Sequence, residues 1–174
     1  MIEEITRQNM KDINKPTQPF EIIGKIVPAF VGGIWSFLEY LYENPYEKVY
    51  PDDEENWEDY IGNPDQTVFF YYADGECVGQ IRLRKNWNGY AYVEDLAVAK
   101  KYRGNGVGTK LIQKAVEWAK WKDLPGITLE TQDANLLACR FYSKAGFQIG
   151  GVDTMLYDNL NEANENAVFW YMKF

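Results

Sequence analysis

The 174-residue sequence contains no histidine and only two cysteines, which excludes several kinds of catalytic centre. Without histidine there can be no Ser-His-Asp or Cys-His triad and no histidine-ligated metal. Cys77 and Cys139 lie far apart without metal-ligand spacing, which favours two reduced thiols in a cytoplasmic protein and no metal site. Any general base near neutral pH must then be a carboxylate, a tyrosine, a perturbed lysine or water.

Long apolar runs and an excess of basic residues are also missing. No apolar run approaches the roughly 20 residues that span a bilayer, and the polar, acidic start is not a secretory signal. The net charge of −8 argues against nucleic acid as partner, because phosphates repel such a surface. We therefore expect neither a membrane nor a nucleic acid as partner. A small cationic molecule suits this charge better, although an acidic balance also serves solubility.

The chain from Thr67 onward predicts antiparallel strands. Three segments rich in β-branched and aromatic residues follow one another, at 67–73, 77–85 and 90–98. The pairs Asp74-Gly75 and Asn88-Gly89 connect them, and such pairs are typical of hairpin turns. Before this region, 19–51 mixes β-branched and aromatic residues with prolines, which predicts irregular strands and short helices. The acidic stretch 52–61 predicts a short helix or simply a solvated face.

The second half of the chain predicts helices that alternate with strands. Residues 108–122 carry apolar side chains at helical spacing. A strand at 126–132 and a helix at 135–146, closed by Gly146, come next, and two more strands, at 147–157 and 167–174, end the chain. Strand, helix, strand and helix in succession indicate a parallel pair inside an otherwise antiparallel sheet. The predicted class is mixed α/β, approaching α+β.

A short glycine-rich turn, residues 104–108, opens the helix at 108–122. Two common phosphate-binding designs fit it poorly. The P-loop requires Gly-Lys-Ser/Thr, whereas Thr109 precedes Lys110 in this chain. The Rossmann fingerprint places its glycines directly after the strand, but "AKKYR" intervenes here.

A third design, R-x-x-G-x-G, is met by Arg103, Gly106 and Gly108. Because glycine lacks Cβ, successive backbone N–H groups can converge on an anion, and the helix N-terminus adds its unpaired amides. Arg103 would add a charge-assisted contact. A turn that only caps a helix has the same local pattern, so the motif alone leaves both interpretations open.

In its context, the sequence resembles the GNAT superfamily of N-acetyltransferases, whose members bind acetyl-coenzyme A with this turn. "TLETQDANLLACRFYSKAGF" is similar to a second family motif, a strand, an Asn and a helix ending in Tyr and Gly-Phe. The resemblance implies the GNAT fold, a mostly antiparallel sheet with a central splayed parallel strand pair and flanking helices. It also implies one domain over 1–174, with a substrate-side segment at 1–66 and an acetyl-coenzyme A-binding core at 67–174.

Other stretches, among them "PFEIIGKIVP" and "GGVDTMLY", are similar to a group within the superfamily that inactivates streptothricin antibiotics. That group acetylates an amine of the β-lysine arm, and the resemblance implies direct transfer from acetyl-coenzyme A through a ternary complex. The alternatives are another cationic amine, such as a polyamine, an aminoglycoside or a protein N-terminus, and a non-catalytic acyl-coenzyme A sensor. Monomer and homodimer both stay open.

The resemblance also assigns the residues that bind the cofactor. Backbone groups of 96–98 would pair with the pantetheine arm, and one of their N–H groups would face the developing oxyanion. Asn135 would contact the same arm, and the glycine-rich turn would hold the pyrophosphate. The expected set is Leu96, Ala97, Val98, Arg103, Gly104, Asn105, Gly106, Val107, Gly108, Thr109 and Asn135.

By the same resemblance, Tyr142 is the general acid that protonates the departing thiolate, and a tyrosine pKa of about 10 suits this role. Without the motif, the position of Tyr142 in an apolar helix favours a core residue. The candidates for the general base are Glu94, Asp95 and Glu130. We favour Glu94 as base, directly or through water, and expect Asp95 and Glu130 to bind the cationic substrate. Strand alternation places Glu94 and Asp95 on opposite faces unless a bulge intervenes.

Overall fold

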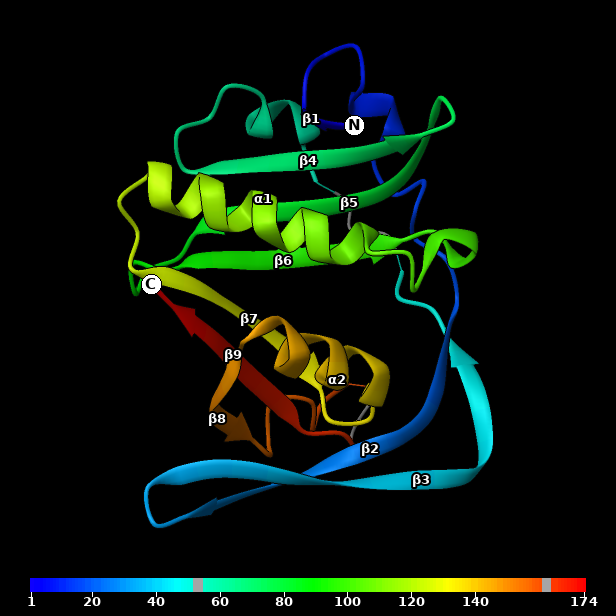
Figure 1. Ribbon diagram of the computed structural model, residues 1–174, viewed down its shortest axis with the longest axis vertical. Coiled ribbons are helices and arrows are strands. Elements are labelled where there is room, and N and C mark those ends of the chain that lie inside the picture. The colour runs from blue at the N-terminus through cyan, green and yellow to red at the C-terminus, as the bar shows by residue number, and fades with distance from the viewer. Residues whose placement is uncertain (52–54, 161–163) are drawn as a thin grey trace. The chain divides into compact units, whose positions relative to one another are not determined.

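A computed structural model describes residues 1–51, 55–160 and 164–174, and the chain divides into two compact units. Unit 1 comprises Met1–Phe20 and Val49–Ile127, and unit 2 comprises Glu21–Lys48 and Thr128–Phe174. Each unit is therefore assembled from two separate stretches of sequence, as the colours of Figure 1 show. No helix in the described part of the chain is long and apolar enough to cross a membrane.

Unit 1 is an antiparallel sheet with one long helix. Its elements are β1 (Ile2–Glu4), η1 (Met10–Asp12), η2 (Trp57–Tyr60), β4 (Gln66–Ala73), β5 (Glu76–Lys85), β6 (Ala91–Val98), η3 (Lys100–Tyr102) and α1 (Val107–Trp121). β1 pairs with β4, β4 with β5, and β5 with β6, all antiparallel. The prediction of three successive antiparallel strands is thus confirmed, while β1 was not anticipated.

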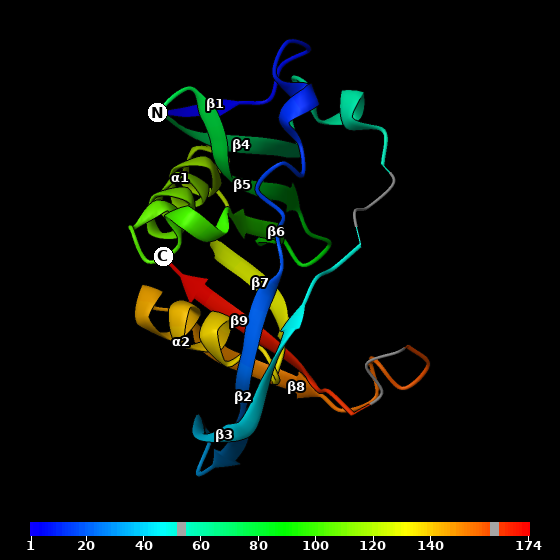
Figure 2. The ribbon, with the colours of Figure 1, turned by 90° about the vertical axis from the view of Figure 1, so that its right-hand side faces the viewer.

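Turn chemistry and packing explain this arrangement. Asp74 and Gly75 have φ values of 51° and 81°, the left-handed pair that a two-residue hairpin turn requires. Helix α1 packs against one face of β4, β5 and β6 (Figures 1 and 2), and its apolar stripe includes the buried Leu111 and Ala115. A Cβ at Gly79 would lie 2.8 Å from the Val107 side chain, so the close approach of α1 to β5 requires glycine there.

Unit 2 combines a long hairpin with three strands and a helix. Its elements are β2 (Phe20–Val31), β3 (Ile34–Lys48), β7 (Gly126–Gln132), α2 (Leu136–Ala145), β8 (Gln148–Asp153) and β9 (Ala167–Lys173). β2 and β3 form a two-stranded sheet, while β9 lies between β7 and β8. Helix α2 buries Leu136, Cys139 and Tyr142, and Gly146 ends it at φ 99°. The helix and strands predicted for 126–174 are confirmed, except that β8 ends at Asp153.

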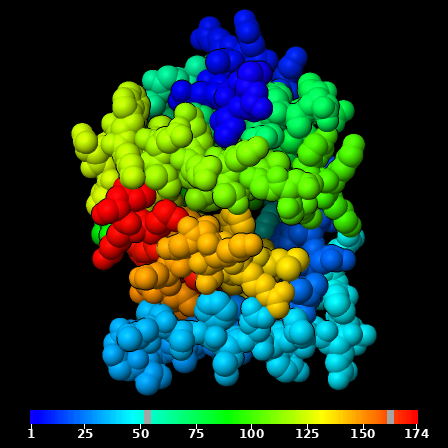
Figure 3. Space-filling view, in the orientation of Figure 1, coloured from blue at the N-terminus to red at the C-terminus, as the bar shows by residue number. Residues whose placement is uncertain are grey.

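The strands predicted within 19–51 are present and form the β2–β3 hairpin, but the short helices predicted there were wrong, because this stretch contains no helix. Gly32 and Gly33, at φ 60° and 82°, make its tight turn. A Gly-Gly pair between β-branched runs is a hairpin signal, and the prolines obscured it. Pro28 and Pro45 are tolerated because both strands of a two-stranded sheet are edge strands. Figure 3 shows how broadly the hairpin is exposed, with Val31, Ile34 and Leu38 more than 70% accessible.

The short helix predicted at 52–61 falls partly on 52–54, which lie outside the described residues. Within the described part, η2 forms a single 3-10 turn at Trp57–Tyr60. Tyr60 is buried there in a cluster with Ile5, Val68 and Phe70. The acidic stretch therefore contributes a core residue as well as a solvated face.

Candidate active site

The glycine-rich turn leads directly into α1. Gly104 and Gly106 have φ values of 77° and 80°, a region that residues with side chains rarely adopt. A Cβ on either glycine would have no protein atom within 4 Å. The two glycines are therefore required by backbone conformation and leave the space in front of the turn open.

The first turn of α1 presents unpaired backbone donors. Gly106 is the N-cap residue and no side chain caps the helix. The first helical bond runs from the Lys110 amide to the Gly106 carbonyl at 3.1 Å, so the amides of Val107, Gly108 and Thr109 have no acceptor within the helix. These donors and the positive end of the helix dipole suit a diphosphate, and side chains at 104 or 106 would fill the space it needs.

Arg103 is used differently from the sequence expectation. Its Nε donates to the Val98 carbonyl at 2.8 Å, and its terminal nitrogens donate to the carbonyls of Pro19 (2.8 Å) and Gln18 (2.9 Å). The guanidinium thus ties the end of β6 to the N-terminal segment and fixes the turn. At least three of its N–H groups are therefore used within the protein, and a contact of Arg103 with an anion stays a prediction.

Strand β6 contains a bulge at Glu94. Val93 pairs with Leu83 and Asp95 with Arg82, so Glu94 is an extra residue in the ladder. Both carboxylates consequently reach one face of the sheet. Glu94 contacts Arg82 and Asp95 accepts from Gln80 Nε2 at 2.6 Å, and these two β5 residues share a face. The bulge that the sequence left open is present.

Glu94 is held by several partners that the sequence reasoning missed. Its Oε1 lies 2.8 Å from Arg84 Nε, and its Oε2 lies 3.5 Å from Arg82 Nε and accepts from the Tyr60 hydroxyl at 2.9 Å. Burial raises the pKa of Glu94, and the Tyr60 hydrogen bond and the two arginines oppose the rise. The alternating arginines of β5, opposite two acids of β6, were a detectable signal. Nothing in the sequence pointed to Tyr60.

The three residues of β6 that are expected to bind the pantetheine arm follow the bulge directly. Leu96, Ala97 and Val98 pair with Ile81, Gln80 and Gly79 of β5 in register. All three are partly accessible. Their pairing with a pantetheine arm stays a prediction.

Glu130 lies on β7 in unit 2, half-buried. The Tyr157 hydroxyl donates a hydrogen bond to its Oε1, a partner that no sequence pattern indicated. Burial raises the pKa of Glu130 to about 7. A carboxyl group with such a pKa exists in both protonation states at neutral pH, as a general base requires.

Tyr142 is buried in α2 within an aromatic cluster. Its ring lies 5.7 Å from that of Phe147 and 6.4 Å from that of Trp170, measured between centroids. Asn135 precedes the helix, and its Oδ1 accepts from the Ala138 amide at 3.2 Å, so it is the N-cap of α2. Asn135 therefore has a structural role beside the cofactor contact expected from the sequence.

The fold and these residues define an acetyltransferase. The family model "Acetyltransferase (GNAT) family" matches residues 34–147, and the chain belongs to this family. The predicted GNAT fold and N-acetyltransferase class are confirmed.

Individual relatives are more specific than the family. Streptothricin acetyltransferase A of Bacillus subtilis (strain 168) is 51% identical over 174 residues, which is 100% of each chain. Streptothricin acetyltransferase of Escherichia coli is 39% identical over 74% of this chain and 71% of its own. A crystal structure from Bacillus anthracis, assigned as a streptothricin acetyltransferase in complex with acetyl coenzyme A, superposes with a TM-score of 0.93 at 37% identity, covering 100% of this chain and 99% of that chain.

Proposed function

We propose that this chain transfers an acetyl group from acetyl-coenzyme A to an amine of the β-lysine arm of streptothricin, directly within a ternary complex. One observation carries the proposal. The chain is 51% identical to a streptothricin acetyltransferase along the whole length of both proteins. A relative that matches at a TM-score of 0.93 binds acetyl coenzyme A, and the glycine-rich turn of this chain fits a diphosphate.

The bound cofactor would supply the thioester from which the acetyl group is transferred. The amides at the start of α1 would hold its pyrophosphate, and Arg103 would keep the turn in shape. Backbone groups of 96–98 would pair with the pantetheine arm, and one N–H would stabilise charge on the acyl oxygen. Asn135 caps α2 with its side-chain oxygen, so its side-chain nitrogen would contact the same arm.

The general acid in this proposal is Tyr142, which would protonate the departing thiolate. Because the chain has no histidine, we choose the general base among its candidate carboxylates. Glu94 is the choice made from sequence, but two arginines and Tyr60 engage its oxygens. Glu130 has one hydroxyl partner and a pKa of about 7, so its surroundings favour it as base. Asp95 and whichever of the two glutamates is not the base would attract the cationic acceptor.

The test is to incubate the purified protein with streptothricin and acetyl-coenzyme A and to follow thiol release and product mass. We expect a gain of one acetyl group, located by fragmentation on the β-lysine arm, and protection of sensitive bacteria that express the protein. A panel with spermidine, an aminoglycoside and an N-terminal peptide runs in parallel. If a panel amine is acetylated and streptothricin is not, the proposed substrate is overturned and the enzyme class is kept. No thiol release with any amine would leave only an acyl-coenzyme A-binding protein.

A further inference from the structure

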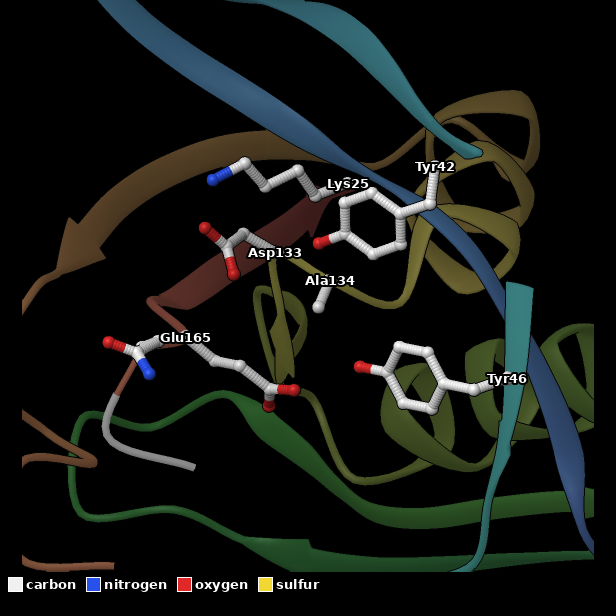
Figure 4. Close-up of a pocket in the computed structure, with 7 residues that line it drawn as sticks. Lys25, Tyr42, Tyr46, Asp133, Ala134 and Glu165 are labelled. Atoms are coloured by element: carbon white, nitrogen blue, oxygen red, sulfur yellow. The ribbon is translucent and has the colours of Figure 1, made fainter. Parts of the chain in front are cut away.

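Unit 2 contains a cavity of about 230 Å³ that none of the residues discussed above lines. Residues far apart in sequence surround it: Lys25 of β2, Tyr42 and Tyr46 of β3, Asp133 after β7, and Glu165 before β9. Figure 4 shows the two tyrosine hydroxyls directed toward the two carboxylates. The cavity is smaller than the roughly 300–1,000 Å³ of pockets for drug-sized ligands, so it suits one arm of a larger molecule.

Asp133 is the acidic residue of this cavity that pairs with no described lysine or arginine, whereas Glu165 pairs with Lys48. It is only 2% exposed, and its two oxygens accept from the backbone amide (3.0 Å) and side-chain amide (2.8 Å) of Asn166. Within the described residues Asp133 forms no ion pair, so its partners are neutral. A buried carboxylate is normally paired with a cation, because neutral donors replace only part of its lost hydration.

The two tyrosines add groups that attract a cation. Their rings stack with centroids 6.5 Å apart and planes 13° from parallel. Neither hydroxyl has a hydrogen-bond partner among the residues that the structure describes, so both keep lone pairs for a ligand. Burial and the nearby Tyr46, Asp133 and Glu165 raise the pKa of Tyr42, so its hydroxyl stays neutral. Aromatic faces and phenol oxygens are common partners of ammonium groups.

The lysines decide which sign of ligand the cavity prefers. Lys48 binds Glu165 at 2.9 Å, with both side chains largely buried, and so neutralises that carboxylate. Lys25 lines the cavity but forms no ion pair with a described residue. A cation would use Asp133 and the tyrosine oxygens, whereas an anion would use Lys25 and would lie against Asp133. The oxygen-rich lining favours the cation.

We propose that this cavity binds an ammonium group of the cationic acceptor, with Asp133 as its charged partner and the Tyr42 and Tyr46 hydroxyls as acceptors. The inference rests on the proposed function and names residues that select its substrate. These residues bind the acceptor rather than take part in proton transfer. Their loss should therefore change KM for the acceptor and leave KM for acetyl-coenzyme A unchanged.

The test compares KM for streptothricin and for acetyl-coenzyme A in five variants. Asp133→Asn should raise KM for streptothricin at least about tenfold, and Tyr42→Phe and Tyr46→Phe about threefold to tenfold each, as for charged and neutral hydrogen bonds. Lys25→Met should lower it, because it removes a competing positive charge. Glu43→Gln is the control, since it removes an exposed charge of β3 outside the cavity. Thermal unfolding checks that Asp133→Asn remains folded. If Asp133→Asn does not fold, KM for streptothricin in Tyr46→Phe tests the inference independently, because Tyr46 is half-exposed.

Unchanged KM for streptothricin in folded Asp133→Asn and Tyr46→Phe would overturn the inference. So would a Lys25→Met variant with a raised KM for acetyl-coenzyme A, because the cavity would then bind the anionic cofactor. If the wild-type protein fails to acetylate streptothricin, the proposed function falls separately. Calorimetry with spermidine and lysinamide then tests whether the cavity binds an ammonium group. Weaker binding to Asp133→Asn than to the wild type supports the inference, and equal binding overturns it.

Discussion

The glycine-rich turn before α1 and the cavity lined by Asp133 differ in how each presents its binding groups. The turn uses backbone amides within one short segment, and Gly104 and Gly106 are fixed there by positive φ values. The cavity uses side chains from β2, β3 and the segments next to β7 and β9. Backbone sites leave a glycine pattern in the sequence, whereas side-chain sites assembled across a fold leave none. The two predicted activities, cofactor binding and substrate selection, are therefore unequally visible in the sequence.

The largest effect is expected from substituting Tyr142. The substitution tests whether this buried aromatic residue, which lies outside the glycine-rich turn, also acts as the general acid. Tyr142→Phe should lower kcat at least about 100-fold, as removal of a general acid does, and leave acetyl-coenzyme A affinity nearly intact. The ring contacts with Phe147 and Trp170 do not need the hydroxyl, and thermal unfolding checks that the variant remains folded. Steady-state kinetics and calorimetry measure both. Full activity would make Tyr142 a core residue only.

The second prediction separates the two carboxylates. Glu130→Gln should lower kcat/KM at pH 7 by roughly 30-fold, because a base is lost that water replaces poorly. In the wild type, activity should rise with pH through about 7 as Glu130 ionises, and this step should disappear in Glu130→Gln. Glu94→Gln should keep it. The reverse pattern, with the step lost only in Glu94→Gln, would restore the base chosen from sequence.

Stability gives a readout of Glu130 that does not depend on activity. Its pKa rises from 4.5 to about 7 on folding, so between these values the folded protein holds a proton that the unfolded chain releases. The free energy of unfolding should therefore fall as pH rises from 4.5 to 7. Glu130→Gln should flatten that slope in chemical denaturation, while Glu43→Gln, which removes an exposed carboxylate of β3, serves as the control.

The glycine turn itself is the subject of the third prediction. Arg103→Ala combined with Gly106→Val should weaken acetyl-coenzyme A binding roughly tenfold or more, because a Cβ at 106 fills the open space and disfavours φ 80°. Arg103→Ala alone should weaken it less, since its guanidinium mainly bonds three carbonyls of the protein. Calorimetry on folded variants measures both. Unchanged affinity in the double variant would reduce the turn to a helix cap.

Most of the core fold was predictable because its signals are local. Asp74-Gly75 marks a turn, the apolar stripe of α1 marks a helix, and Gly146 marks a helix end. The β2–β3 hairpin was missed because prolines masked the Gly32-Gly33 turn. The bulge at Glu94 depends on the register between β5 and β6, which the sequence of one strand does not contain.

The site divides in the same way. Arg103 was found by its motif, but its three carbonyl partners include Gln18 and Pro19, far away in sequence. Glu130 was found as a candidate, although its raised pKa comes from burial that only the folded chain creates. Asp133 was not considered, because an aspartate after a strand looks like an ordinary turn residue.

The smallest effect is expected from salt, and it tests whether substrate selection is electrostatic. The chain carries a net charge of −8, and the presumed acceptor is a compact polycation. Raising ionic strength from about 0.05 to 0.5 M shortens the screening length severalfold, so KM for streptothricin should rise about twofold to fivefold with kcat nearly constant. The rise should be smaller in Asp133→Asn, which has already lost its charged contact. If KM for an uncharged acceptor rises with ionic strength to the same extent, salt acts on the enzyme itself and the prediction fails.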